Sequence, residues 1–159
     1  MISCLGKLEE STKVTDVVKV GQQLPDFAVT TSDSNLVSSG NLRGRASVIV
    51  FFSTQCKDCL RALPTLQGVY DKYKKRVAFV CISRAQSGND IAAYWQAHDL
   101  DMPYSAQTDR SVYALFATAG IPRVYVSDSN GFVRAVYIEK VNGDTLCKTL
   151  DTLIAEKNT

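Results

Sequence analysis

This sequence is poor in histidine, has little net charge and lacks long apolar runs. It holds one histidine, His98, and one Cys-x-x-Cys pair, so a tetrahedral zinc site lacks convincing ligands. The formal net charge is +2 and no basic cluster stands out, so neither nucleic acid nor an anionic membrane surface is implied as a partner. No stretch approaches the roughly 18 to 20 apolar residues that span a bilayer. We therefore expect no metal and no cofactor, and we interpret His98, on the apolar edge of an expected helix, as structural.

Cysteine is present, but not in the pattern of a disulfide scaffold. The five cysteines are an odd number without scaffold-like spacing, and 159 residues with 45% hydrophobic content can build one domain with its own core. Cys81 lies in an apolar run, and Cys147 shares an expected helical face with Leu150 and Ile154. Both cysteines are predicted to be inert buried thiols.

Cys4 is a separate case. The segment 1–4 resembles the end of a bacterial lipoprotein signal, in which a small residue precedes the cysteine that becomes lipidated. The charged start and the apolar stretch of such a signal are missing here. Cys4 is therefore a candidate lipidation site that would give the chain an N-terminal lipid anchor, and the alternative is a chance cysteine in a frayed terminus.

The sequence Cys56-Lys57-Asp58-Cys59 is the most informative motif of the chain. It follows the apolar run 46–52, whose β-branched and aromatic residues predict a buried strand. It opens a stretch with apolar residues at helical spacing, namely Leu60, Leu63, Leu66, Val69, Tyr70 and Tyr73. Unpaired N–H groups and the dipole at the start of a helix favour a thiolate, so the pair predicts a redox site.

The rest of the chain predicts an α/β domain at 21–159, preceded by a polar and charged N-terminal tether or lead-in at 1–20. The further elements expected are a strand at 77–82, a helical insert around 88–118, hairpin strands at 123–127 and 132–138, and a last helix at 143–156. Asn89 or Asp90 can cap the first helix of the insert, and Asp109 can cap a second one. The strand at 77–82 is reached through a helix, so it should lie parallel to the first strand. This order predicts a central mixed sheet flanked by helices on both faces.

Two motifs together carry a family resemblance. A strand, Cys56-x-x-Cys59, a helix with Pro64 inside it, and Gly120-Ile121-Pro122 before a hairpin and a last helix resemble the thioredoxin superfamily. The long N-terminal lead and the helical insert are similar to its TlpA/ResA-like branch, which comprises thiol–disulfide oxidoreductases of the bacterial cell envelope. The resemblance covers about residues 21–157, and it implies a thioredoxin-like fold and a location in the envelope or periplasm.

The resemblance also implies a role for each motif residue. Cys56 would be the exposed nucleophile that attacks a protein disulfide, and Cys59 would be the shielded thiol that resolves the mixed disulfide. The peptide bond before Pro122 would be cis, and the backbone of Ile121 would offer strand-like hydrogen bonds to the substrate. The alternative for Pro122 is a trans proline that starts a strand. The partners would be protein disulfides and an upstream membrane or periplasmic thiol that donates electrons.

Three positions depart from the pattern of the family. The tryptophan that usually precedes the first cysteine is Gln55, the buried aspartate six residues before that cysteine is Val50, and the glutamate three residues after the second is Ala62. Both acids are thought to take the proton from the resolving thiol. Activation of Cys59 must then rely on another group, such as Asp58, water or an acid that the fold brings near.

The residues around the two motifs are expected to tune the site. Lys57 should favour the Cys56 thiolate and Asp58 should oppose it, so their effects partly cancel. With Gln55 they are the predicted tuning residues. Arg123 directly follows the Ile-Pro pair, and it either flanks the site or is a solvated strand arginine.

Two other functions are alternatives to disulfide reduction. Peroxiredoxins share this fold, but they place a threonine three residues before the reactive cysteine, whereas Thr54 lies two residues before Cys56. The pattern of a thiol peroxidase is therefore not met. The missing tryptophan and acids also allow a redox-weak binding module. The sequence favours an envelope enzyme that reduces protein disulfides.

Overall fold

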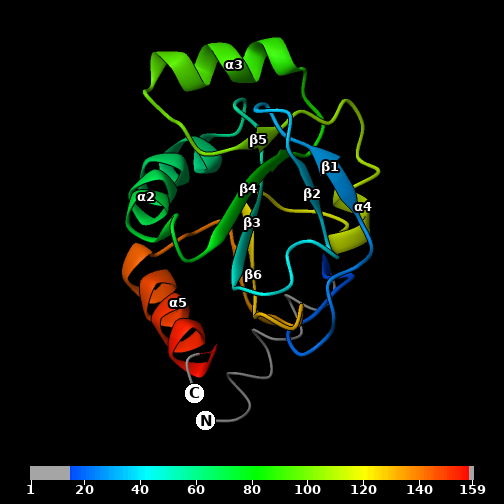
Figure 1. Cartoon of the computed structure of the whole chain (residues 1–159). Coiled ribbons are helices and arrows are strands. Elements are labelled where there is room, and N and C mark those ends of the chain that lie inside the picture. Colours follow the sequence, from blue (N-terminus) through cyan, green and yellow to red (C-terminus); the bar gives the residue numbers. More distant parts are fainter. Residues whose placement is uncertain (1–14, 158–159) are drawn as a thin grey trace, which may run out of the picture.

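The computed structural model describes residues 15–157, which fold around a five-stranded mixed sheet in the order β5-β4-β3-β6-β7 (Figure 1). The strands are β1 (Ala28–Thr30), β2 (Leu36–Ser38), β3 (Ser47–Phe52), β4 (Ala78–Ser83), β5 (Tyr104–Ser105), β6 (Arg123–Ser127) and β7 (Val133–Ile138). The helices are α2 (Lys57–Tyr73), α3 (Gly88–Ala97), α4 (Tyr113–Phe116) and α5 (Gly143–Lys157). β1 and β2 form a separate antiparallel pair.

The central strand β3 is buried along its whole length, as its apolar run predicts. All six of its residues are buried, which is expected for a strand covered on both faces. β3 pairs in parallel with β4 and antiparallel with β6. The predicted parallel pair and the predicted mixed sheet are therefore confirmed, and the carboxyl end of β3 leads directly into the cysteine motif.

Helices cover the sheet on both sides (Figure 1). On one side α2 and α5 lie together, and the Tyr73 hydroxyl donates a hydrogen bond to the Asp151 carboxylate at 2.6 Å. On the other side α4 and the β1–β2 pair meet, with the rings of Phe27 and Phe116 packed edge to face at 5.5 Å. Trp95 of α3 packs against Phe52 at 5.2 Å between ring centroids, so it belongs to the core. No helix within residues 15–157 is both long enough and apolar enough to cross a bilayer.

The insert differs from its prediction as an all-helical segment. It contains the short strand β5, which pairs in parallel with β4 and extends the sheet. The N-cap of α3 is Ser87 rather than Asn89 or Asp90. Asp109 accepts a hydrogen bond from the Ser111 N–H, while α4 begins only at residue 113 and has four residues. A strand of two residues lacks the alternation that would reveal it in a sequence.

The end of the N-terminal lead-in is packed onto the domain. Asp16 forms an isolated bridge with Ala117, and the Val17 N–H donates to the Phe116 carbonyl at 2.9 Å. Val18 is buried in the core. Residues 15–18 therefore contact the segment that precedes β6. Cys4 lies outside the described residues.

Candidate redox site

Cys56 and Cys59 lie where β3 ends and α2 begins. Cys56 is the N-cap of α2, with extended backbone angles (φ −104°, ψ 121°), and its sulfur accepts a hydrogen bond from the Cys59 N–H at 3.3 Å. The first N–H groups of a helix have no partner within the helix, and the positive end of the helix dipole lies there. The Cys56 sulfur thus lies at the N-terminus of α2, which is where the sequence predicted this pair.

The two thiols differ in exposure. Cys56 is half-buried and Cys59 is fully buried. Burial raises the pKa of the Cys59 thiol well above its usual range, and the hydrogen bond with Cys56 raises it further. The backbone at Ser53 and the positive charge of Arg84 act in the opposite direction and lower that pKa. An accessible sulfur therefore lies beside a thiol that is held in its neutral form.

The Ile121–Pro122 peptide bond is cis, which confirms the expectation and excludes the trans alternative. The Cys56 thiol donates to the Ile121 carbonyl oxygen at 3.8 Å. Ile121 and Pro122 are both buried, and the Pro122 carbonyl accepts from the Glu139 N–H at 2.8 Å. The segment before β6 is thus placed directly against the first cysteine.

Gln86 supports the loop between β3 and the cysteines, and the sequence motifs gave no indication of it. Its carbonyl oxygen accepts from the Thr54 N–H at 2.9 Å, and its amide nitrogen donates to the Thr54 hydroxyl. Gln86 is buried although its type is mostly exposed in proteins. The residue lies just after β4, where a glutamine carries no signal of its own in a single sequence.

The expected tuning residues lie at the surface around the pair. Gln55 and Lys57 are exposed. Asp58 is half-buried and forms an ion pair with Arg61 at 3.2 Å. Arg61 was not among the predicted site residues, although i,i+3 spacing on a helix brings such pairs together.

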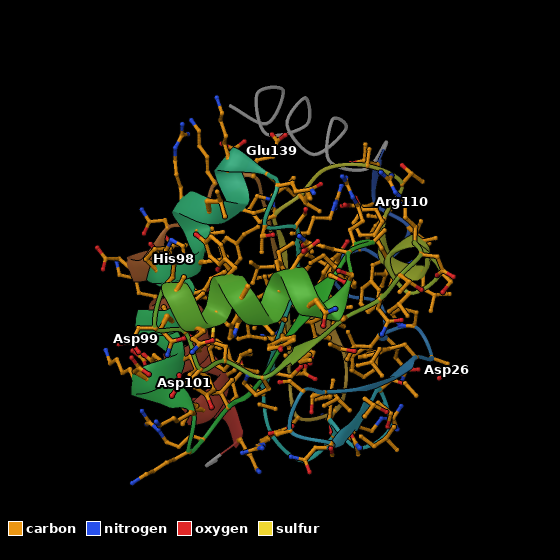
Figure 2. The ribbon with its side chains drawn as sticks, turned by 90° about the horizontal axis from the view of Figure 1, so that it is seen from above. Asp26, His98, Asp99, Asp101, Arg110 and Glu139 are labelled. Atoms are coloured by element: carbon orange, nitrogen blue, oxygen red, sulfur yellow. The ribbon has the colours of Figure 1, made fainter. Side chains whose placement is uncertain are left out.

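The positions of the two missing acids are apolar in the structure as well as in the sequence. Val50 is completely buried in β3, and Ala62 is buried on α2. Ala62 lines a cavity of about 290 Å³ together with Asp58, Arg61, Glu139, Lys140 and Val141. Figure 2 shows Glu139 beside the first turns of α2, and its backbone is left-handed, with φ 66°. Among the described residues, Arg84 is a charged side chain that acts on the Cys59 thiol, and it is a cation rather than an acid.

Three other residues that the sequence singled out lie away from the cysteine pair. Cys81 is fully buried, and burial raises the pKa of its thiol, in agreement with an inert role. Cys147 is only half-buried on α5. His98 follows the last turn of α3 (Figure 2), where it is exposed and stacks on the Tyr94 ring at 3.8 Å between centroids. Its predicted place on an apolar edge is therefore wrong. Within residues 15–157 no cluster of side chains could hold a metal ion.

The environment of Arg123 also differs from its prediction. It is not a solvated strand arginine, because its side chain is fully buried. The hydrogen bonds that the structure shows for its guanidinium go to the Ala119 and Gly120 carbonyls, to Tyr125 and to the lead-in, rather than to the cysteines. Its guanidinium forms an ion pair with Asp16 at 2.5 Å. This partner could not be predicted from the sequence because it lies in the lead-in, 107 residues earlier.

The sheet order, a Cys-x-x-Cys pair at the start of α2 and a cis-proline against it together define a thioredoxin-like protein. The fold class predicted from the sequence is therefore confirmed. The chain belongs to the AhpC/TSA family, which matches residues 20–136.

Comparison with known proteins supports the same fold. A thiol-disulfide oxidoreductase ResA of Bacillus cereus is 22% identical over 135 residues, which are 84% of this chain and 76% of that protein. A solution structure from Bacteroides thetaiotaomicron matches with a TM-score of 0.83 and 21% identity, over 89% of this chain and 93% of that one. The crystal structure of a secreted thiol-disulfide isomerase from Corynebacterium glutamicum matches with a TM-score of 0.75 and 17% identity, over 84% and 86%.

Proposed function

We propose that this chain is a thiol–disulfide oxidoreductase that acts outside the cytoplasm and reduces disulfides of proteins. The observation that carries the proposal is the position of the Cys56 sulfur. It accepts a hydrogen bond from the Cys59 N–H at 3.3 Å and lies 3.8 Å from the Ile121 carbonyl oxygen. A half-exposed sulfur at a helix N-terminus, beside a segment of backbone, suits attack on a disulfide in a polypeptide.

The reaction proceeds in two exchanges that balance in electrons. The Cys56 thiolate attacks one sulfur of the substrate disulfide, and the other substrate sulfur leaves as a thiolate that takes up a proton. Cys59 then loses its proton and attacks the Cys56 sulfur of the mixed disulfide. The second substrate thiol is released, and the protein is left with a Cys56–Cys59 disulfide. The two electrons that the substrate gains are those that the cysteine pair loses.

The second exchange is the slower one in this proposal. The Cys59 thiol is fully buried, and its raised pKa leaves little thiolate at neutral pH. Arg84 lowers that pKa by charge, which assists the step without accepting the proton. Water that reaches the half-exposed Cys56 can accept the proton.

The binding and tuning roles follow from the neighbours of Cys56. Ile121 and Pro122 form the surface on which the substrate backbone lies. Gln55 and Lys57 are exposed next to the reactive sulfur and contact the substrate. The charge of Asp58 is offset by Arg61, so it opposes the thiolate less than the sequence alone implies.

The proposed location and partners are inferred from the relatives rather than from the geometry of the site. The relatives include ResA and a secreted thiol-disulfide isomerase, which favour an extracytoplasmic site in the bacterial envelope or periplasm. The oxidised pair then needs an upstream thiol donor in the membrane or periplasm. Lipidation of Cys4 would attach the chain to a membrane.

Two assays on three proteins test the function. Insulin reduction with dithiothreitol as electron donor and peroxide consumption are measured on wild type, Cys56→Ser and Cys147→Ser. Cys147 is a matched control because it is a half-buried thiol outside the site. We expect insulin reduction in wild type and in Cys147→Ser, and none in Cys56→Ser. Peroxide turnover without insulin reduction would indicate a thiol peroxidase, and neither activity would indicate a binding module.

Trapping then identifies the substrate. Cys59→Ser removes the resolving thiol, so the mixed disulfide with Cys56 should accumulate. Mass spectrometry of the trapped adducts from an envelope extract names the partner. The double variant Cys56→Ser/Cys59→Ser is the control, and adducts that persist in it come from other thiols.

A further inference from the structure

Arg123 has the largest fully buried side chain among residues 15–157. An arginine is rarely buried without partners, and the surroundings of this one supply them on two sides. On one side are two backbone carbonyls of the segment before the cis-proline. On the other side is the packed end of the N-terminal lead-in.

The contacts toward the cis-proline are made by the fork of the guanidinium. Nε and Nη2 donate to the Ala119 carbonyl at 3.1 and 2.8 Å, and Nε also donates to the Gly120 carbonyl at 3.2 Å. The Tyr113 hydroxyl donates to that same Gly120 carbonyl at 2.8 Å. The two residues that precede Ile121 are thus held by side chains rather than by strand pairing.

The contacts toward the lead-in complete the bridge. Nη1 pairs with the Asp16 carboxylate at 2.5 Å, and Nη2 donates to the Thr15 hydroxyl at 2.6 Å. Nη1 also donates to the Tyr125 hydroxyl at 3.2 Å. The side chain of Asp16 is 5% exposed, so this is a desolvated ion pair.

We propose that Arg123, oriented by Asp16, is a positioning residue that fixes the backbone of Ala119 and Gly120, and with it the surface that Ile121 offers to a substrate polypeptide. The lead-in is then part of the substrate-binding apparatus of the domain. The proposal rests on the proposed function, because it assigns Arg123 to the binding step of that reaction.

The chemistry of the side chain favours this role over a purely stabilising one. A buried ion pair can often be replaced by apolar residues of similar volume without loss of stability, so stability alone does not require it. Only the planar fork of arginine can direct several N–H groups at two neighbouring carbonyls and a carboxylate together. Lysine keeps the charge, but its three N–H groups radiate from one compact ammonium and cannot reproduce the spread of the fork.

Two variants separate positioning from stability. Arg123→Lys keeps a charge opposite Asp16 and loses the fork, while Asp16→Leu/Arg123→Met replaces the pair by apolar side chains. Arg134→Lys is the matched control. Arg134 lies on β7, away from the cis-proline, and forms exposed ion pairs with Asp128 and Glu156.

The readout is the split between KM and kcat for two disulfides, insulin and hydroxyethyl disulfide. In both variants we expect KM for insulin to rise about tenfold, the effect of one lost hydrogen-bonding arrangement, with kcat unchanged. Reduction of hydroxyethyl disulfide should be unchanged, since it has no backbone to bind. Equal losses on both disulfides, or an unchanged KM for insulin in a folded variant, would refute the positioning role.

Measurement of amide hydrogen exchange tests the proposal without an activity assay. The Thr118 N–H donates to the Thr15 carbonyl at 2.9 Å, so its hydrogen exchange reports contact of the lead-in with this segment. Exchange should accelerate in Arg123→Lys and not in Arg134→Lys. If wild type reduces neither disulfide while exchange accelerates as expected, the proposed function fails and the bridge stands. If exchange is unchanged, the bridge itself is wrong.

Discussion

Gln86→Leu should destabilise the protein through one well-defined loss. The residue is 8% exposed, and its side chain forms two hydrogen bonds with Thr54, one from the Thr54 N–H and one to its hydroxyl. Each such bond contributes about 0.5 to 1.5 kcal/mol, and an N–H left unpaired costs more. Leucine has a similar volume and can make neither bond. We therefore expect a loss of about 2 kcal/mol, roughly a 30-fold change in the ratio of folded to unfolded protein.

Gln67→Leu is the matched control. Gln67 also accepts from a distant backbone N–H, that of Asp101 at 3.0 Å, and its amide group donates to two carboxylates. These bonds are at the surface, where competition with water leaves a smaller net gain, so the cost should stay below about 1 kcal/mol.

Urea unfolding under reducing conditions measures both changes. The fluorescence of Trp95, the single tryptophan, reports the transition because its ring packs against Phe52. Hydrogen exchange at Thr54 should accelerate in Gln86→Leu, and disulfide reduction should slow because the loop leads directly to Cys56. Equal losses of stability in the two variants would contradict the claim that the buried amide pair holds this loop.

Three further predictions concern the thiols and one surface ion pair. Cys56→Ser keeps an acceptor at the N-cap and Cys56→Ala does not, so the alanine variant should be about 1 kcal/mol less stable in urea unfolding. Arg84→Gln removes a charge that lowers the pKa of Cys59, so Cys59 should release thionitrobenzoate from a Cys56 mixed disulfide more slowly across the mildly alkaline range. An unchanged rate would mean that the charge does not act on this thiol. The Arg134 side chain lowers the pKa of Glu156 below its ordinary value of 4.5, so the pair stabilises the fold above that value and loses its effect as pH falls through the lowered one. Glu156→Gln should therefore reduce stability at neutral pH, and the gap to wild type in urea unfolding should close once the pH is well below 4.5.

The parts of the structure that depend on local pattern could be predicted from the sequence. The apolar run before Cys56 and the helical spacing after Cys59 place the motif at a strand–helix junction without knowledge of the rest. The Ile121–Pro122 pair was recognisable because its spacing from the cysteines belongs to a family pattern, and the cis bond followed from that resemblance.

The parts that depend on distant contacts could not be predicted. Arg123 looks like an ordinary strand residue until Asp16 is placed against it, and the two lie 107 residues apart. The role of Gln86 could not be predicted for the same reason, since its partner Thr54 lies 32 residues away. His98 was placed inside a helix, whereas α3 ends one residue earlier at Ala97 and leaves His98 exposed, because a helical pattern does not show where the helix ends.

The bridge between Asp16 and Arg123 has a consequence for the order of folding. During synthesis residue 16 leaves the ribosome long before residue 123, so this contact must wait until β6 has been made. Contacts between residues so far apart in the sequence form late, because closing a long loop costs chain entropy before the contact contributes any favourable interaction energy. A nascent chain that stops before residue 123 would contain both cysteines of the motif, but the arginine that holds the Ile121–Pro122 surface in place would be missing.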